Sequence, residues 1–226
     1  MISIKMKNMR ASRSTILLTG FGPFPGVPVN VSGPLTEAIA RRAATRFRSK
    51  RIVTAVLPTE WQTAPRRLAE FYRKETPALV LHFGVSERAR DLVIETRALN
   101  RRGPTPDAAA ARPKSSCIIA GGPDHLDVGL PVESIVDRLR AMGIPASRSD
   151  DAGSYLCNTV LYHSLRLAAA MAVPAAVGFV HIPTELVDLA AENPGRRLTW
   201  IEALAGCIEI IRTCLGLPVL ENELTS

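Results

Sequence analysis

Apolar strand patterns alternate with amphipathic helix patterns along this chain, and this alternation constrains the fold more than any other feature. Residues 78–84 form a continuous apolar run, typical of a strand that is buried on both faces of a parallel sheet. Strand patterns at 14–20 and 52–57 are followed by helical patterns at about 32–47 and 63–74. This order predicts an α/β fold with right-handed crossovers. We therefore expect a single three-layer α/β/α domain with a mostly parallel, twisted central sheet.

The second half of the chain continues the alternation after a less regular stretch. Residues 92–99 predict one strand, and residues 101–131, rich in Gly, Pro and Ala, predict a long surface excursion. The remaining predictions are a helix at 132–142, an edge strand at 146–149, a helix from Cys157 to about 171, a strand at 175–183 and a helix at about 199–215. The 226 residues suffice for one well-formed core. We expect it at residues 14–226, behind a flexible arm at 1–13.

Charge and hydropathy make several classes of protein less plausible. The 28 basic residues exceed the 21 acidic ones by seven, but they are scattered and have no aromatic residues interleaved. This pattern indicates a solvated surface and leaves nucleic-acid binding as a weaker alternative. The apolar segment near the N-terminus breaks at Gly20, and no segment reaches the roughly 18 apolar residues of a membrane span. We therefore expect neither a nucleic-acid partner nor a membrane partner.

The four cysteines, at positions 117, 157, 207 and 214, are irregularly spaced. They form no CxxC pair and have no histidine at metal-binding spacing, which argues against zinc. Irregular spacing in a chain of this size also argues against a disulfide framework. We expect a cytoplasmic protein without a metal ion or cofactor.

Cys157 stands out among these cysteines because of the sequence before it. Asp150, Asp151, Gly153 and Ser154 precede a run of good helix formers, which predicts a loop that enters a helix. In the first helical turn, unpaired backbone N–H groups and the helix dipole favour a thiolate, the nucleophilic form of cysteine. The competing interpretation is that Cys157 is a small buried hydrophobic residue.

Two further titratable residues lie in predicted strands. Glu95 follows three apolar residues, and His181 lies just before the end of the 175–183 strand. The carboxyl ends of parallel strands meet at one crevice, so these side chains are expected to converge with Cys157. A sulfur, an imidazole and a carboxylate are the groups that nucleophilic acyl transfer requires. The alternatives are a hydrogen-bonded core histidine, and an ion pair of Glu95 with Arg97 or Arg101.

Two phenylalanines occupy a loop that would normally be polar. Phe21 and Phe24 lie in a Gly-rich and Pro-rich segment directly after the first predicted strand. Apolar rings at the end of a strand either cover the core or line a pocket.

Four segments together resemble one known family, the type I pyroglutamyl peptidases, also called pyrrolidone-carboxylate peptidases. The matching segments are 18–24 with Asn30, 82–86 with 94–100, 151–158, and 178–183. They correspond to the family's N-terminal Gly-Phe-x-Pro-Phe motif, its glutamate strand, its nucleophile motif and its histidine motif. Order and spacing agree from about residue 16 to residue 190.

The resemblance implies a cysteine exopeptidase that removes N-terminal pyroglutamate from peptides through a thioester intermediate. Cys157 would attack the carbonyl carbon, His181 would act as general base and then general acid, and Glu95 would orient His181. The family also suggests a homodimer or homotetramer.

The same resemblance implies a pocket for the pyroglutamyl ring. Phe21 and Phe24 would enclose the lactam, and Asn30 would bind its amide. Backbone groups near Gly84 and Val85 would meet the ring carbonyl, and Tyr155 would contribute to the pocket.

Two departures from the family pattern leave alternatives open. Pro25 and Gly26 replace the usual pair of glycines, which could stiffen or shift the ring-binding loop. Many members carry an active-site arginine after the glutamate strand, and Arg97, Arg101 or Arg102 would have to replace it here. The alternative functions are therefore a related cysteine amidase or a pseudoenzyme of the same family.

Overall fold

The structure, a computed structural model, describes residues 13–186 and 197–218, so the expected N-terminal arm lies outside the described residues except for Arg13. The elements in chain order are β1 (Thr15–Phe21), α1 (Ser32–Arg46), β2 (Arg51–Leu57), α2 (Thr63–Glu75), β3 (Leu79–Ser86), β4 (Leu92–Glu95), β5 (Arg97–Leu99), β6 (His125–Asp127), α3 (Val132–Ala141), β7 (Ala146–Ser149), α4 (Leu156–Ala169), β8 (Ala176–Pro183) and α5 (Trp200–Cys214). Within the described ranges, no helix combines the length and the apolar character needed to cross a membrane.

Six strands form the central sheet in the order β2-β1-β3-β8-β4-β7. β1 pairs in parallel with β2 and β3, and β3 pairs in parallel with β8. β4 pairs antiparallel with β8, and β7 runs parallel to β4 at the edge. The predictions of a mostly parallel sheet and of an edge strand at 146–149 are therefore confirmed.

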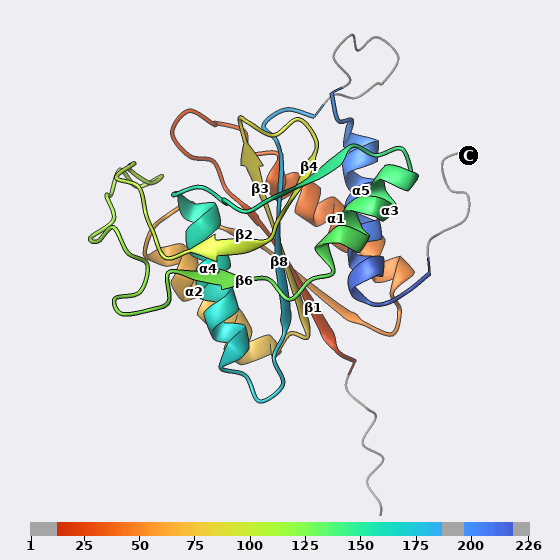
Figure 1. Ribbon diagram of the computed structural model, residues 1–226, viewed down its shortest axis with the longest axis horizontal. Helices are drawn as coiled ribbons and strands as arrows, with labels where there is room; N and C mark the ends of the chain where they lie inside the picture. Colours follow the sequence, from red (N-terminus) through yellow and green to blue (C-terminus); the bar gives the residue numbers. More distant parts are fainter. Residues whose placement is uncertain (1–12, 187–196, 219–226) are drawn as a thin grey trace, which may run out of the picture.

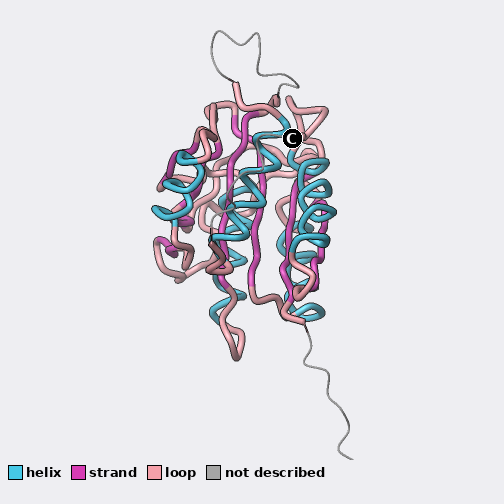
Figure 2. Tube along the Cα trace, turned by 90° about the vertical axis from the view of Figure 1, so that its right-hand side faces the viewer, coloured by secondary structure: helices cyan, strands magenta, loops and turns pink. Residues whose placement is uncertain are grey.

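Helices cover both faces of this sheet, which gives the expected three layers (Figure 1). Buried residues of α1, α3 and α5 pack on one face, and those of α2 and α4 pack on the other. Figure 2 shows the strands side by side behind the first helix group. Almost every residue of β1, β3 and β8 is buried. This agrees with their largely apolar sequences, which are typical of strands covered on both faces.

Side-chain alternation along β8 decides which of its residues face α4. Val180 and Ile182 belong to the core under α1, α3 and α5, whereas Val177 and Phe179 pack on the α2 and α4 side. Because successive side chains point to opposite faces, His181 shares the α4 side with Phe179. It therefore faces the helix that carries Cys157.

The prediction of one strand at 92–99 is wrong. The chain leaves the central sheet at Thr96, whose N–H donates to the Ser149 carbonyl at 2.7 Å. β5 then pairs antiparallel with β6 in a separate two-stranded sheet. β6 was not expected within the 101–131 excursion, which is otherwise irregular. The three residues of β6 have no alternating apolar pattern that would predict a strand. This strand forms only because it pairs with β5.

Candidate active site

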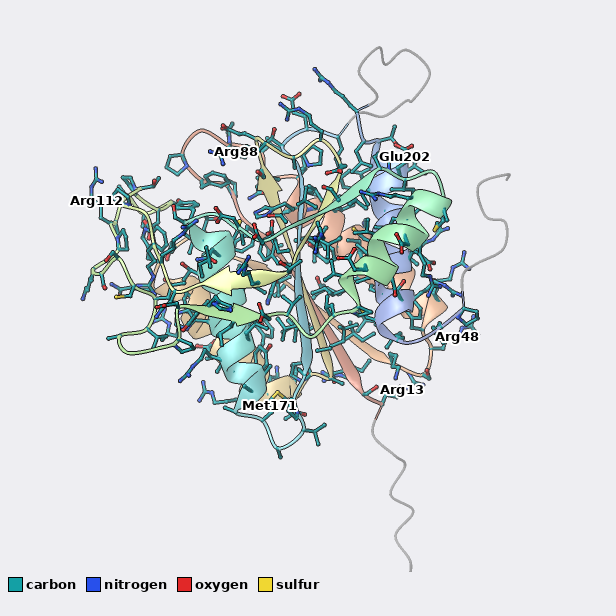
Figure 3. The ribbon with its side chains drawn as sticks, viewed as in Figure 1. Arg13, Arg48, Arg88, Arg112, Met171 and Glu202 are labelled. Atoms are coloured by element: carbon teal, nitrogen blue, oxygen red, sulfur yellow. The ribbon has the colours of Figure 1, made fainter. Side chains whose placement is uncertain are left out.

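A cavity of about 910 Å³ opens at the end of the sheet toward which β3 runs. It is lined by residues from β3, β4 and β8, by the loops after β1 and β2, and by the start of α4. Arg88, one of its lining residues, lies at this end of the molecule, and Met171, just beyond α4, lies at the opposite end (Figure 3). Cys157, His181 and Glu95 all line the cavity, so the structure brings the three expected residues together.

Cys157 is the second residue of α4, as expected from the sequence before it. The preceding loop uses Gly153 at a φ of 82°, and Tyr155 is the extended residue that caps the helix. The first N–H groups of a helix have no partner within the helix, so they are directed toward any group bound at the helix start. The thiol is thus placed beside ready hydrogen-bond donors.

A glycine beneath Cys157 allows this close packing. A Cβ atom on Gly84 would lie 3.0 Å from the Cys157 sulfur and 2.7 Å from Cζ of Phe179. Because these distances are shorter than ordinary van der Waals contacts, a side chain here would displace the thiol or the ring. Gly84 pairs in register with His181, which places the thiol and the imidazole over neighbouring strands.

Glu95 binds His181 directly, with 2.7 Å between its Oε1 and Nδ1 of the imidazole. Both side chains are almost completely buried. Their approach does not follow from the convergence of parallel strand ends, because β4 is antiparallel to β8 and Val93 is the residue paired with His181. Glu95 lies two positions further along the same face and is the diagonal neighbour of His181.

The charges around His181 favour its protonated form. Burial lowers the pKa of the ring, but the charge and hydrogen bond of Cys157, together with the hydrogen bond and charge of Glu95, outweigh burial and raise it to about 10. The imidazole therefore carries a proton at neutral pH when it faces the sulfur. Nδ1 of the protonated ring and the buried Glu95 carboxylate form an ion pair.

The expected ring-pocket residues Phe21, Phe24, Asn30, Val85 and Tyr155 also line the cavity, while Gly84 lies under the thiol. The Phe24 and Tyr155 rings pack 5.7 Å apart, centroid to centroid. Together with Phe21 they give one side of the cavity an aromatic lining.

Asn30 is buried and organises the loop after β1. Its Nδ2 donates to the Gly22 carbonyl at 2.9 Å, and its Oδ1 accepts from the Ser32 N–H and hydroxyl at 3.2 and 2.8 Å. Thr59, which follows β2, donates to the same Gly22 carbonyl at 2.9 Å. The loop that carries both phenylalanines is therefore fixed by side chains at its base.

Pro25 and Gly26 form the tip of this loop. Phe24 and Val27 exchange backbone hydrogen bonds of 3.2 and 2.9 Å across it. Gly26 has a φ of 85°, and Pro followed by Gly at positive φ is the pattern of a type II turn. The proline that replaces the family's usual glycine thus fits a tight turn.

Phe179 and Trp61 were not expected at the site. The Phe179 ring lies 4.8 Å from the His181 ring, and Trp61 packs edge-on against Tyr155 at 5.1 Å. Phe179 lies two residues before His181 on the same strand, so the two-residue period of a strand was the signal that could have identified it. No sequence pattern could have identified Trp61, because it is far from Tyr155 in the sequence and meets it only in the folded chain.

The three candidate arginines occupy different places. Arg97 binds Asp150, and Arg101 binds both carboxylate oxygens of Asp151 at 2.8 Å. Neither pairs with Glu95, which is occupied by His181. Arg102 lies over the Trp61 ring, 6.0 Å from its centroid. Of the three, Arg101 lines the cavity.

Among the described residues, no group of three or more His, Cys, Asp or Glu side chains could hold a metal ion. The arrangement consists instead of a thiol at a helix start, an imidazole hydrogen-bonded to it and a carboxylate on the other ring nitrogen. These features, at one end of a mostly parallel sheet, define the class of cysteine hydrolases with an α/β fold.

Comparisons with known proteins identify the family within this class. The family described as "Pyroglutamyl peptidase" matches residues 14–210. Pyrrolidone-carboxylate peptidase 1 of Ralstonia nicotianae is 36% identical over 183 residues, covering 80% of this chain and 83% of its own. The Cupriavidus pinatubonensis pyrrolidone-carboxylate peptidase is 34% identical over 215 residues, covering 92% and 96%.

Solved structures agree with the sequence relatives. Pyroglutamyl peptidase I of Bacillus amyloliquefaciens superposes with a TM-score of 0.78 at 27% identity, covering 90% of this chain and 97% of its own. Pyrrolidone carboxyl peptidase of Thermus thermophilus gives 0.75 at 31% identity, covering 88% and 99%. The chain belongs to the pyroglutamyl peptidase family, cysteine peptidases that remove N-terminal pyroglutamate.

Proposed function

We propose that Cys157, His181 and Glu95 carry out the hydrolysis of N-terminal pyroglutamyl residues in this protein. The observation that carries the proposal is the chain of contacts from Glu95 through His181 to Cys157, which ends in a cavity with an aromatic wall. Each catalytic role is filled by one side chain: Cys157 is the nucleophile, His181 is the base and Glu95 is the orienting acid.

In the acylation step, the Cys157 sulfur attacks the carbonyl carbon of the pyroglutamyl residue, and the carbonyl electron pair moves to oxygen. The N–H groups at the start of α4 stabilise that oxyanion. When the intermediate collapses, the C–N bond breaks, and His181 gives its proton to the departing amine. The product is a thioester on Cys157 and a peptide shortened by one residue.

In the deacylation step, His181 takes a proton from water, which attacks the thioester carbon. The C–S bond breaks, pyroglutamate leaves, and the sulfur departs as the thiolate beside protonated His181. Glu95 remains ionised throughout and keeps the ring oriented. These steps use only side chains, backbone groups and water.

The ring slot is formed by Phe21, Phe24, Asn30, the backbone near Gly84 and Val85, and Tyr155. A flat, uncharged lactam suits an aromatic wall with a few fixed polar groups. Burial, and then the charges of Asp107 and Cys157, raise the pKa of Tyr155 to about 12, so its hydroxyl stays neutral. An ordinary N-terminus would bury its ammonium without a partner, so the slot selects against it.

The substrates in this proposal are N-terminally pyroglutamylated peptides, and neither nucleic acid nor membrane takes part. We place the enzyme in the cytoplasm as a homodimer or homotetramer, with one peptidase domain at residues 14–226. The four unbridged cysteines support a reducing compartment.

A pyroglutamyl aminomethylcoumarin amide tests the proposal. We expect the unmodified protein to hydrolyse it, and Cys157→Ala to reduce kcat/KM by at least about a thousandfold, because the nucleophile is lost. Cys117→Ala is the matched control, since Cys117 is a partly buried thiol outside the cavity lining. A folded unmodified protein without turnover would contradict the proposal and favour a pseudoenzyme or related amidase.

A further inference from the structure

The cavity continues beyond the ring slot, on the far side of His181. Phe21, Phe24 and Asn30 follow β1, at one side of the sheet. The order of strands then places Cys157 over Gly84 of β3, and His181 on the neighbouring β8. β4 and β7 come next, and the cavity lining includes Val93, Ser149 and Asp151 from these strands and the loop that follows.

This order indicates where the leaving residue of a substrate lies. The ring occupies the β1 side, and the carbonyl carbon must meet the sulfur near β3. The departing amine must lie beside His181 on β8, because it receives the proton there. A substrate that passes these points in sequence continues toward the wall formed by β4, β7 and the segment after β5.

Among the described residues that line the cavity, Arg101 is the cation at this wall, since Arg88 follows β3. Its side chain is 53% exposed and lines the cavity. Its carbonyl accepts from Nδ2 of Asn158 at 3.0 Å, so its backbone is tied to the residue after Cys157. The position of this guanidinium is therefore linked to the start of α4.

Within the described part of the chain, one nitrogen of the Arg101 guanidinium has a hydrogen-bond partner. Nη2 donates to both oxygens of Asp151, and Asp151 is itself held by the Gly153 N–H at 3.0 Å. Nε and Nη1 have no hydrogen-bond partner among the residues that the structure describes. Asp151 thus anchors the guanidinium and leaves donors for a second carboxylate, which a planar fork binds well.

We propose that Arg101 binds a carboxylate on the residue that follows pyroglutamate in the substrate. This inference rests on the proposed function. The carboxylate is either the C-terminus of a pyroglutamyl dipeptide or an acidic side chain. Glu87 and Arg88, which also line the cavity, are adjacent residues of opposite sign, whereas Arg101 is held in place by Asp151.

Arg97 provides a matched control. It also binds a loop aspartate, through Nη2 to the Asp150 carboxylate and Nε to the Asp150 carbonyl. It lies four residues away in the same segment but does not line the cavity. Loss of either arginine removes one ion pair to the loop before α4, yet only Arg101 is proposed to meet substrate.

The experiment compares kcat/KM within two pairs of substrates. One pair is pyroglutamyl-alanine and its amide, and the other is pyroglutamyl-glutamyl amide and pyroglutamyl-glutaminyl amide. For at least one pair, we expect Arg101→Gln to lower the ratio of the anionic to the neutral substrate about tenfold, the effect of losing a charge-assisted hydrogen bond. Arg101→Lys should restore part of the ratio, and Arg97→Gln should leave it unchanged.

The substrate pair whose ratio falls in Arg101→Gln shows whether the bound carboxylate is the C-terminus of a dipeptide or an acidic side chain. Because a ratio is measured, partial loss of folded protein cancels, and rescue by Arg101→Lys shows that charge is responsible. Unchanged ratios in Arg101→Gln, with all four substrates hydrolysed, would overturn this inference alone. Absence of hydrolysis by the unmodified protein would instead overturn the proposed function and this inference with it.

Discussion

At the scale of single residues, the surroundings of His181 keep its imidazole protonated. Its pKa is raised from 6.5 to about 10 because Cys157 and Glu95 outweigh the opposing effect of burial. A pKa raised on folding means that protonated His181 stabilises the fold below pH 6.5, and that this contribution is lost as the pH rises through about 10. Across neutral pH, the imidazolium and the sulfur therefore stay paired.

Glu95→Gln tests the part that Glu95 plays in this pairing. Removal of its charge lowers the pKa of His181, so the imidazolium beside the sulfur loses its proton at a lower pH than in the unmodified protein. We expect the step in the pH profile of Cys157 alkylation by iodoacetamide that follows His181 deprotonation to move about one pH unit lower, because loss of the carboxylate charge removes roughly 1.4 kcal/mol of stabilisation from the imidazolium. The measurement is the alkylation rate as a function of pH, with Glu87→Gln at the cavity rim as the control. Superimposable profiles for Glu95→Gln and the unmodified protein would show that Glu95 does not act through charge.

At the scale of elements, Asn158 joins the start of α4 to β5. It is fully buried, and its Oδ1 accepts from the Leu99 N–H at 2.8 Å. Its Nδ2 donates to the carbonyls of Leu99 and Arg101 at 2.8 and 3.0 Å. The segment after Glu95 is thus fastened to the turn that carries Cys157.

Asn158→Ala would leave three backbone groups without their side-chain partner. Each buried unsatisfied group costs about 1–3 kcal/mol, so we expect the free energy of unfolding to fall by roughly 2–4 kcal/mol after partial relaxation. Urea unfolding measures the change. Thr45→Ala is the control, because Thr45 donates a similar bond to the Arg42 carbonyl on the exposed surface. A loss below about 0.5 kcal/mol, the size of an ordinary surface change, would contradict this role.

The sequence predicted most elements of the fold but not the direction of β4. Helix starts and apolar strands carry local patterns, and the expected boundaries of α1, α2, α3 and α5 agree closely with the structure. Strand direction carries no such pattern, since Leu92–Glu95 would read the same in either orientation. The expectation that Glu95 lies near His181 rested on the convergence of parallel strand ends, and β4 is not parallel to β8. The two residues meet instead as diagonal neighbours on antiparallel strands.

At the scale of the whole molecule, the fold gives the four cysteines different environments. Burial raises the pKa of the Cys207 thiol far above its usual range, and that of Cys214 to about 12. Cys157 instead opens into the cavity beside His181. Cys117 is partly buried, and its sulfur accepts from the Ser115 hydroxyl.

This difference predicts the order in which the thiols react. We expect limiting iodoacetamide at neutral pH to label Cys157 first and Cys117 more slowly. Cys207 and Cys214 should react only when denaturant unfolds the chain, because their thiolates are disfavoured in the core. Peptide mapping by mass spectrometry measures the order, with denatured protein as the control. Rapid labelling of Cys207 in folded protein would show that the core around α5 opens readily.

The amino-acid sequence by itself determined the α/β class, the helix start at Cys157, and the residue types at the site. These depend on local patterns: hydrophobic periods, helix-capping residues and motifs that are contiguous in the chain. Only the tertiary structure decided that β4 is antiparallel and that β5 leaves the sheet. It also decided that Trp61 packs against Tyr155 and that Arg101 is the arginine at the cavity. These features depend on residues distant in sequence, and only the packing of the whole chain brings such residues into contact.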